Sequence, residues 1–280
     1  MVKKGLAQTL RAFIASRHSL RPSMKRLLAL TLAAAASCSS PSVSVTPYLA
    51  QNSLDGSVAS STDGASGSTS VEALGVDGEE SVLGGRIDVR GDHSHLSLSY
   101  TSTDLSATGG ILSDDIEIDG TTIDSDSVSV DTDLDIAATN AMWTYDWNIG
   151  ETAFFGLGLG VTALDLSIAL TGAEEITGLI VTATLDETLP VPLIAARAGG
   201  EIGPVWIEGS YALLSVSVDE AEVEMSDLDV SAGLKILGDT GSIVVGYRMI
   251  DFDAAYDVDS DSIDLDLAFG GPYAGVRLGF

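Results

Sequence analysis

The sequence predicts an all-β fold: a closed antiparallel transmembrane β-barrel of about ten strands, with eight as the alternative. Segments with apolar residues at every second position recur from about residue 82 to the C-terminus, and no long stretch keeps a 3.6-residue apolar stripe. Short turns alternate with longer acidic connections, which is typical of membrane barrels. Every basic residue after the N-terminal region falls on the polar face of its segment, away from lipid.

Residues 1–38 are predicted to be a signal peptide, with Met1 or Met24 as the start. Seven of the thirteen basic residues lie within the first 26 positions. From Met24 the chain reads MKRLLALTLAAAASCSS, a basic start followed by a short apolar run and small residues. That run is too short to span a bilayer as a helix. Cys38 is either a small residue near the cleavage site or the lipid anchor of a lipoprotein-like box, although Ala35 stands where such boxes usually carry Leu.

Residues 39–81 are rich in Ser, Gly, Thr and Asp and predict an arm, which has a possible first strand near 46–54. The barrel is predicted over 82–280. Its candidate strands are 82–91, 94–106, 133–147, 153–169, 190–202, 205–218, 227–237, 242–255 and 264–280. Bacterial single-chain barrels have even strand numbers, so a strand near 46–54 would complete ten.

The connections separate into two kinds. Four short turns contain Gly, Asp, Asn or Pro and are expected on the periplasmic side: 91–93, 148–151, 202–204 and 237–241. Four longer acidic connections are expected on the extracellular side: 107–132, 170–189, 219–226 and 256–263.

The strand faces predict a charged lumen. In the last strand, Val276, Leu278 and Phe280 share one face, and Arg277 lies on the other. The same separation in the other strands predicts an inward ion-pair network of Arg86, Asp88, Arg90, Arg197, Glu201, Glu208, Asp229, Lys235, Arg248 and Arg277, with Asp146 as a further acid. Such a network could be a packed plug or could line a narrow pore.

Other motifs point to surface features. Trp143, Tyr145 and Trp147 share the outer face of one strand and predict an interfacial aromatic girdle. His93 and His95 lie at a short turn, as exposed residues or as a weak metal site. The glycines at 156, 158 and 160 imitate a nucleotide-binding loop only superficially, because no helix follows them.

The charge excludes several functions. Forty-one acids stand against thirteen basic residues, a formal charge of −28, so nucleic acid is not expected as a partner. One cysteine excludes a disulfide framework and a cysteine-based zinc site.

No cofactor or specific metal site is predicted, because the Asp-rich runs lack the pattern of an EF-hand. Those runs are interpreted as solvated loops and strand extensions that could hold divalent cations loosely, and they include Asp114, Asp115, Glu117, Asp119, Asp124, Asp126, Asp131, Asp133, Asp135, Asp251, Asp253, Asp257, Asp259, Asp261, Asp264 and Asp266.

These features resemble the small outer-membrane β-barrels of Gram-negative bacteria, the class that includes the barrel of outer membrane protein A and the outer membrane protein W type. The run that contains Tyr273, Val276, Leu278 and Phe280 resembles the C-terminal signal read by the barrel assembly machinery, although Leu278 stands where members usually carry an aromatic residue. The resemblance covers residues 82–280 and identifies no subfamily. It implies a monomer in the cell outer membrane, in contact with lipid and lipopolysaccharide.

The functional expectation is a structural or surface-interaction role without catalysis. Barrel enzymes of this class resemble one another in placing a catalytic His near the extracellular side, and this chain has none there. The alternatives are a narrow porin-like channel for small solutes and a secreted soluble β-protein.

Overall fold

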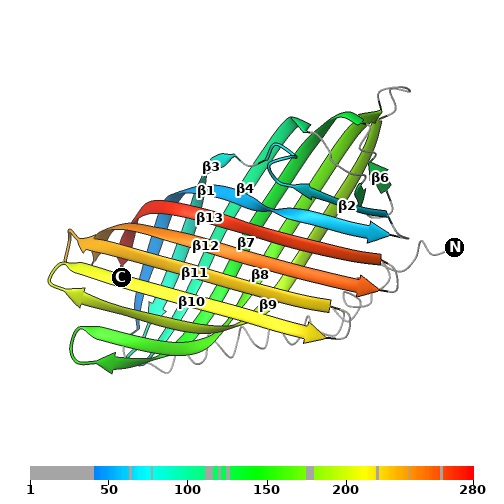
Figure 1. Cartoon of the computed structure of the whole chain (residues 1–280). Coiled ribbons are helices and arrows are strands. Elements are labelled where there is room, and N and C mark those ends of the chain that lie inside the picture. The colour runs from blue at the N-terminus through cyan, green and yellow to red at the C-terminus, as the bar shows by residue number, and fades with distance from the viewer. Residues whose placement is uncertain are drawn as a thin grey trace.

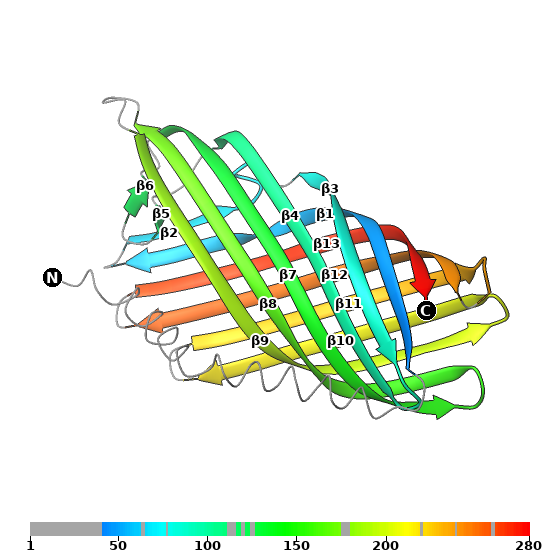
Figure 2. The same ribbon diagram turned by 180° about the vertical axis from the view of Figure 1, so that it is seen from behind.

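The computed structural model is a closed antiparallel barrel of ten strands, which confirms the predicted fold class and strand number (Figures 1 and 2). The structure describes residues 41–62, 65–76, 78–110, 116–118, 121–123, 127–174, 180–218, 221–238, 240–258 and 261–280. The wall strands are β1 (Ser42–Thr62), β3 (Glu79–Arg90), β4 (Ser94–Gly110), β7 (Ser127–Ile149), β8 (Ala153–Glu174), β9 (Ile180–Ile202), β10 (Val205–Val218), β11 (Ala221–Lys235), β12 (Gly241–Val258) and β13 (Asp261–Gly279).

The first and last strands close the barrel. β1 pairs with β3 on one side and with β13 on the other, and the backbones of Val43 and Phe280 exchange two hydrogen bonds of 2.8 and 3.3 Å. β1 lies inside the region for which the sequence predicts an arm, so the barrel wall begins at Ser42. β2 (Ala65–Ser70) folds back on β1, while β5 (Ile116–Ile118) and β6 (Thr121–Ile123) pair only with each other. Within the described ranges, no helix is long and apolar enough to cross a membrane.

The two ends of the barrel differ in their connections. At one end, here called the turn end, Gly150, Gly203 and Gly238 have φ angles of 67°, 61° and 62°, the left-handed conformation that tight turns favour for glycine. At the other end, here called the loop end, much of the sequence predicted as long connections is strand. β9 already begins at Ile180 and β11 at Ala221. The predicted connections 170–189 and 219–226 are therefore longer than the connections in the structure.

The wall divides into two facing sheets towards the loop end. The pairing between β9 and β10 stops at Ile194 and Leu213, and the two strands diverge beyond that point in both views (Figures 1 and 2). Pro190 and Pro192 explain the separation. The N–H of Glu201 points to the β8 side of β9, so by alternation the nitrogens of the two prolines face β10 and have no hydrogen to donate.

A second separation lies between β3 and β4, whose pairing stops at Gly85 and Tyr100. Side chains bridge this seam. The Asn52 amide of β1 donates to the Thr103 hydroxyl of β4 at 3.0 Å, and the Asp104 backbone N–H donates to Glu80 of β3 at 2.6 Å. Side chains thus bond two backbone groups of this β4 edge, because Asn52 also donates to the Ser102 carbonyl at 3.3 Å.

The polarity of the two barrel faces reverses along the strands. In β12, Ile243, Val245 and Tyr247 are exposed on the outer face near the turn end, and Asp253 is exposed on the same face near the loop end. The inner face of the loop-end half holds a buried apolar core. Its members include Leu54, Leu105, Ile136, Leu164, Leu170, Val191, Met225, Ile250, Phe252, Leu267 and Phe269, and Val71, Leu74 and Val76 from the turn after β2 close it.

Candidate functional site: the charged lumen and its pocket

Near the turn end, ion pairs connect opposite walls of the lumen. The Arg90 guanidinium of β3 lies 2.5 Å from the Glu208 carboxylate of β10, and five positions separate these strands around the ten-stranded wall. Arg197 of β9 is also paired with Glu208, at 2.8 Å, and with Asp146 of β7, at 3.0 Å. The Arg197 guanidinium also lies over the ring of Phe154, with 4.4 Å between its Cζ atom and the ring centroid. Arg197 is therefore buried but paired, as a buried charge requires.

Arg86, Asp88 and His95 form the adjoining part of the network. Arg86 lies 3.4 Å from Asp88 and 3.4 Å from Asp229. His95 contacts Asp88 at 3.0 Å and is buried, so the expectation that it is an exposed turn residue was wrong. It is the second residue of β4, where alternation turns the side chain into the lumen. His93 does lie in the exposed turn, and its ring stacks on Tyr145.

A second polar layer lies between this network and the apolar core. Arg248 of β12 donates through Nε and Nη2 to the two carboxylate oxygens of Asp227, at 3.1 and 2.8 Å, and through Nη1 to the Ser99 hydroxyl at 3.1 Å. The Asn140 amide donates to the same carboxylate at 3.3 Å. Sequence reasoning missed Asp227 because it lies at the boundary of the strand predicted over 227–237, although it is two residues from Asp229 and shares its face.

Two glycines make room for lumen side chains. A Cβ at Gly156 would collide with the Asp146 carboxylate and crowd Arg197, and a Cβ at Gly233 would collide with the Trp206 indole. Gly233 is the cross-strand partner of Trp206, so the indole lies across β11 instead of pointing to the barrel axis. Gly156 is thus a packing glycine and not part of a nucleotide loop.

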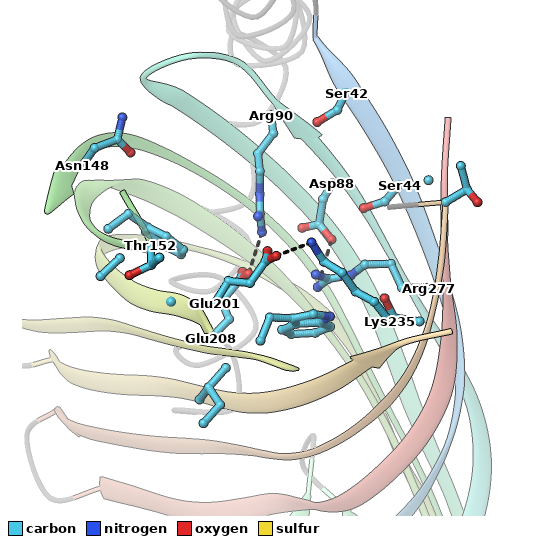
Figure 3. A pocket seen from close by; sticks show the side chains of 18 of the residues that line it. Ser42, Ser44, Asp88, Arg90, Asn148, Thr152, Glu201, Glu208, Lys235 and Arg277 are labelled. Atoms are coloured by element: carbon cyan, nitrogen blue, oxygen red, sulfur yellow. Dashed lines mark hydrogen bonds and ion pairs between the residues drawn. The ribbon is translucent and has the colours of Figure 1, made fainter. Parts of the chain in front are cut away.

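The lumen opens at the turn end into a pocket of about 770 Å³ (Figure 3). Charged residues of five strands line it, with Arg90 and Asp88 from β3, Glu201 from β9, Glu208 from β10, Lys235 from β11 and Arg277 from β13. Deeper in the lumen, the cavities around Arg248 measure only about 10 and 20 Å³. The pocket is therefore a blind recess among the described residues, since the polar layer and the apolar core fill the space behind it.

Lys235 and Arg277 are held differently at the mouth of the pocket. Lys235 of β11 lies 2.5 Å from Glu201 of β9, at the rim. The Arg277 guanidinium stacks on the Trp206 indole, 3.9 Å from the ring centroid. Its nearest carboxylate oxygen is Asp88 Oδ2, 3.9 Å from Nη2 and too far for a hydrogen bond.

The predicted aromatic residues lie on the outer face at the turn end. Tyr145 and Trp147 are exposed, with ring centroids 5.1 Å apart, and Trp147 stacks on Phe155 at 6.3 Å. Trp143 is half-buried on the same face. Val276, Leu278 and Phe280 are exposed at the end of the chain. Tyr273 points into the lumen instead, and its hydroxyl donates to Asp229 at 2.9 Å.

The acidic residues of the loop-end half line up across neighbouring strands. Asp104 is the direct partner of Asp135, and Asp253 is the direct partner of Asp266. Partial burial and the neighbouring Asp104 raise the pKa of Asp135, and partial burial and Asp266 raise the pKa of Asp253. Asp114, Asp115, Asp119, Asp124, Asp126, Asp259 and Cys38 lie outside the described residues. Within the described part, no group of three or more His, Cys, Asp or Glu side chains could hold a metal ion.

Comparison with known proteins identifies a shared fold. No protein-family model and no curated protein matches the chain. The outer membrane protease OmpT from Escherichia coli is 11% identical, with a TM-score of 0.54 over 85% of this chain and 97% of OmpT. Two other solved structures were also found. The Yersinia pestis attachment protein Ail is 12% identical, with a TM-score of 0.28 over 85% of this chain and 99% of Ail. The Pseudomonas putida toluene transporter TodX is 9% identical, with a TM-score of 0.29 over 86% of this chain and 89% of TodX. The likeness to OmpT shows that the chain shares the fold of an outer-membrane β-barrel.

Proposed function

We propose that this protein is a barrel of the Gram-negative outer membrane, with a structural or surface-interaction role and no catalysis, whose closed lumen supports an acidic stalk above the membrane. The observation that carries the proposal is the reversal of face polarity between the two halves. An apolar outer face is stable in hydrocarbon, while an acidic outer face requires water.

The apolar band has the height that a bilayer needs. In β8 the exposed Phe155, Leu157, Leu159 and Val161 lie on the outer face, followed by Ala163, before Asp165 interrupts the series. These nine positions cover roughly 20–25 Å along the bilayer normal, at ~3.3 Å per residue and a tilt of about 40°, which is close to the usual apolar band. A secreted soluble protein would not gain from this belt, because large exposed apolar patches promote aggregation.

The filled lumen favours a supporting role over a pore. The Arg90–Glu208 pair crosses the barrel near the turn end, and the Arg248–Ser99 contact crosses it farther in. Behind them, a water-filled path would need to pass through the apolar core. Solutes could cross only if both the polar layers and this core rearranged.

Cell fractionation tests the location. Without heating, the protein extracted from outer membranes should migrate faster on a detergent gel than the heated protein, because a closed barrel resists unfolding by detergent. Recovery in the soluble periplasmic or secreted fraction would contradict the proposal. Leu159→Arg, which places a charge in the belt, is expected to lower the recovered folded fraction. Ala169→Arg, ten residues farther along the same face of β8, is the matched control.

Planar-bilayer recordings of the refolded protein test the closed lumen. We expect no unitary current steps at neutral pH. Reproducible steps that disappear in Arg248→Met would instead support the narrow channel.

A further inference from the structure

Two lumen arginines use their hydrogen-bond donors very differently. Arg248 donates through Nε, Nη1 and Nη2, and all three bonds are between 2.8 and 3.1 Å. Arg277 has no hydrogen-bond partner for Nε or Nη2 among the described residues. These two nitrogens form one edge of the guanidinium, the edge that binds a carboxylate with two parallel bonds. Among the described residues, this edge of Arg277 is thus a carboxylate-binding edge that no protein group occupies with a hydrogen bond.

Stacking on Trp206 and a long ion pair with Asp88, 3.9 Å between Nη2 and Oδ2, hold Arg277 in position. Its guanidinium carbon lies 3.9 Å from the centroid of Trp206, and Trp206 is seated over Gly233. A guanidinium stacked on an aromatic face keeps its edges available for hydrogen bonds. Nε and Nη2 are buried without a partner, which costs free energy. A small rotation over the indole would turn this edge towards the pocket, where Ser242, the cross-strand partner of Arg277, adds a hydroxyl.

The pocket carries both signs of charge. Its lining includes the cations Arg90, Lys235 and Arg277 and the acids Asp88, Glu151, Glu201 and Glu208, and all of these except Glu151 are labelled in Figure 3. Among the acids that the strands supply, Glu201 is the accessible one, with 45% of its side chain exposed at the rim, whereas the Glu208 and Asp88 side chains are 9% and 3% exposed. A singly charged ligand would be repelled by the groups of its own sign. A ligand with separated positive and negative groups would find a complement for each.

We propose that this pocket binds a small zwitterionic molecule, an amino acid or a short peptide, with its carboxylate on Arg277 and its ammonium group on Glu201. The volume of about 770 Å³ lies within the range of small-molecule sites. The binding site goes beyond the proposed function and takes from it only the membrane location, in which the short turns are expected on the periplasmic side.

Tryptophan emission provides a direct test. The chain has three Trp residues, so Trp143→Phe and Trp147→Phe together leave Trp206 as the sole reporter, in contact with Arg277. The refolded barrel in detergent micelles is titrated with alanylalanine, acetate, ethylammonium or inorganic phosphate. We expect a saturable change with alanylalanine and at least tenfold weaker binding of the other three, since each lacks one of the two charged contacts.

Variants then assign the contacts. Arg277→Gln should weaken alanylalanine binding about tenfold or more, and Arg277→Lys should also weaken it because Lys lacks the two-donor edge. Glu201→Gln should weaken it by a smaller factor. Asp253→Asn, on the outer face of the loop-end half, is the control and should bind as the parent does.

Heat-dependent migration on a detergent gel shows that each variant is folded before it is titrated. The absence of a saturable response in the folded parent would overturn the proposal. Phosphate binding as tight as alanylalanine binding, or unchanged binding by folded Arg277→Gln, would also overturn it. None of these results bears on the membrane location, which fractionation tests separately.

Discussion

The turn-end half and the loop-end half of the barrel use the same strands and the same two-residue alternation with opposite polarity. Near the turn end, β12 places Ile243 and Val245 outside and Arg248 inside. Near the loop end, the same strand places Asp253 outside and Phe252 inside. The turn-end half thus has an apolar outer face and ion pairs inside, which suits hydrocarbon outside, and the loop-end half has an acidic outer face and an apolar core, which suits water outside. The solvent around each half decides which face is apolar.

The difference also determines what stabilises each half. In the proposed membrane location, lipid covers the apolar face of the turn-end half, so the interior of that half is free to hold charges that pair across the lumen, as Arg90 and Glu208 do. Water would then surround the loop-end half, so that half must bury its own apolar groups. The turn after β2 helps by placing Leu74 and Val76 over the core.

The largest expected effect comes from breaking the layer that separates the two interiors. Arg248→Met leaves the buried Asp227 carboxylate without its cation and should lower the free energy of unfolding by about 3–5 kcal/mol. Urea unfolding in lipid vesicles, followed by tryptophan emission, measures the loss. Adding Asp227→Leu removes the unpaired charge and should restore most of the lost free energy of unfolding. A double variant as unstable as the single one would show that the arginine matters through packing alone.

The next largest effect is expected from an added charge on the outer face, whose cost in stability should differ between the two halves. Leu159→Arg in the belt should cost about 2–4 kcal/mol, whereas Ala169→Arg on the same face of β8 should change stability by less than about 0.5 kcal/mol. Equal costs at the two positions would place both on the same side of the membrane boundary and would break the comparison.

The sequence predicts the strands of the turn-end half better than those of the loop-end half. In the turn-end half, exposed apolar residues alternate with charged or small ones along the last strand, so the sequence alone indicated that Arg277 lies on the face opposite Val276 and Leu278. In the loop-end half, outward acids such as Asp253 resemble the composition of loops, so the strand lengths of β9 and β11 were underestimated. Contacts across the lumen, such as Arg90 with Glu208, depend on strand number and register, and local sequence contains neither. The unused donors of Arg277 are likewise visible only in three dimensions.

A cavity in the loop-end core should cost more than the same deletion in the belt. Leu164 is buried in the core and Leu157 is exposed on the belt of the same strand. Leu164→Ala should cost about 3–4 kcal/mol and Leu157→Ala about 2 kcal/mol, because lipid chains can fill the space at the outer face. Urea midpoints in lipid vesicles measure the difference. A larger loss at Leu157 would mean that the belt is packed against another protein surface.

The smallest expected effect is a pH dependence confined to the loop-end half. The pKa values of Asp135 and Asp253 are raised in the folded chain by partial burial and by their acidic neighbours Asp104 and Asp266. A carboxyl group whose folded pKa exceeds its unfolded value of ~3.9 makes folding less favourable as pH rises through the folded pKa. Acidification from pH 7 towards that pKa should therefore stabilise the loop-end half, by less than about 0.5 kcal/mol for each pair because both groups are mostly exposed. Asp135→Asn with Asp253→Asn should be more stable than the parent at pH 7, and the difference should shrink as pH falls. Urea unfolding at pH 7 and after acidification measures the stability difference between variant and parent. A difference that grows on acidification would contradict this electrostatic explanation.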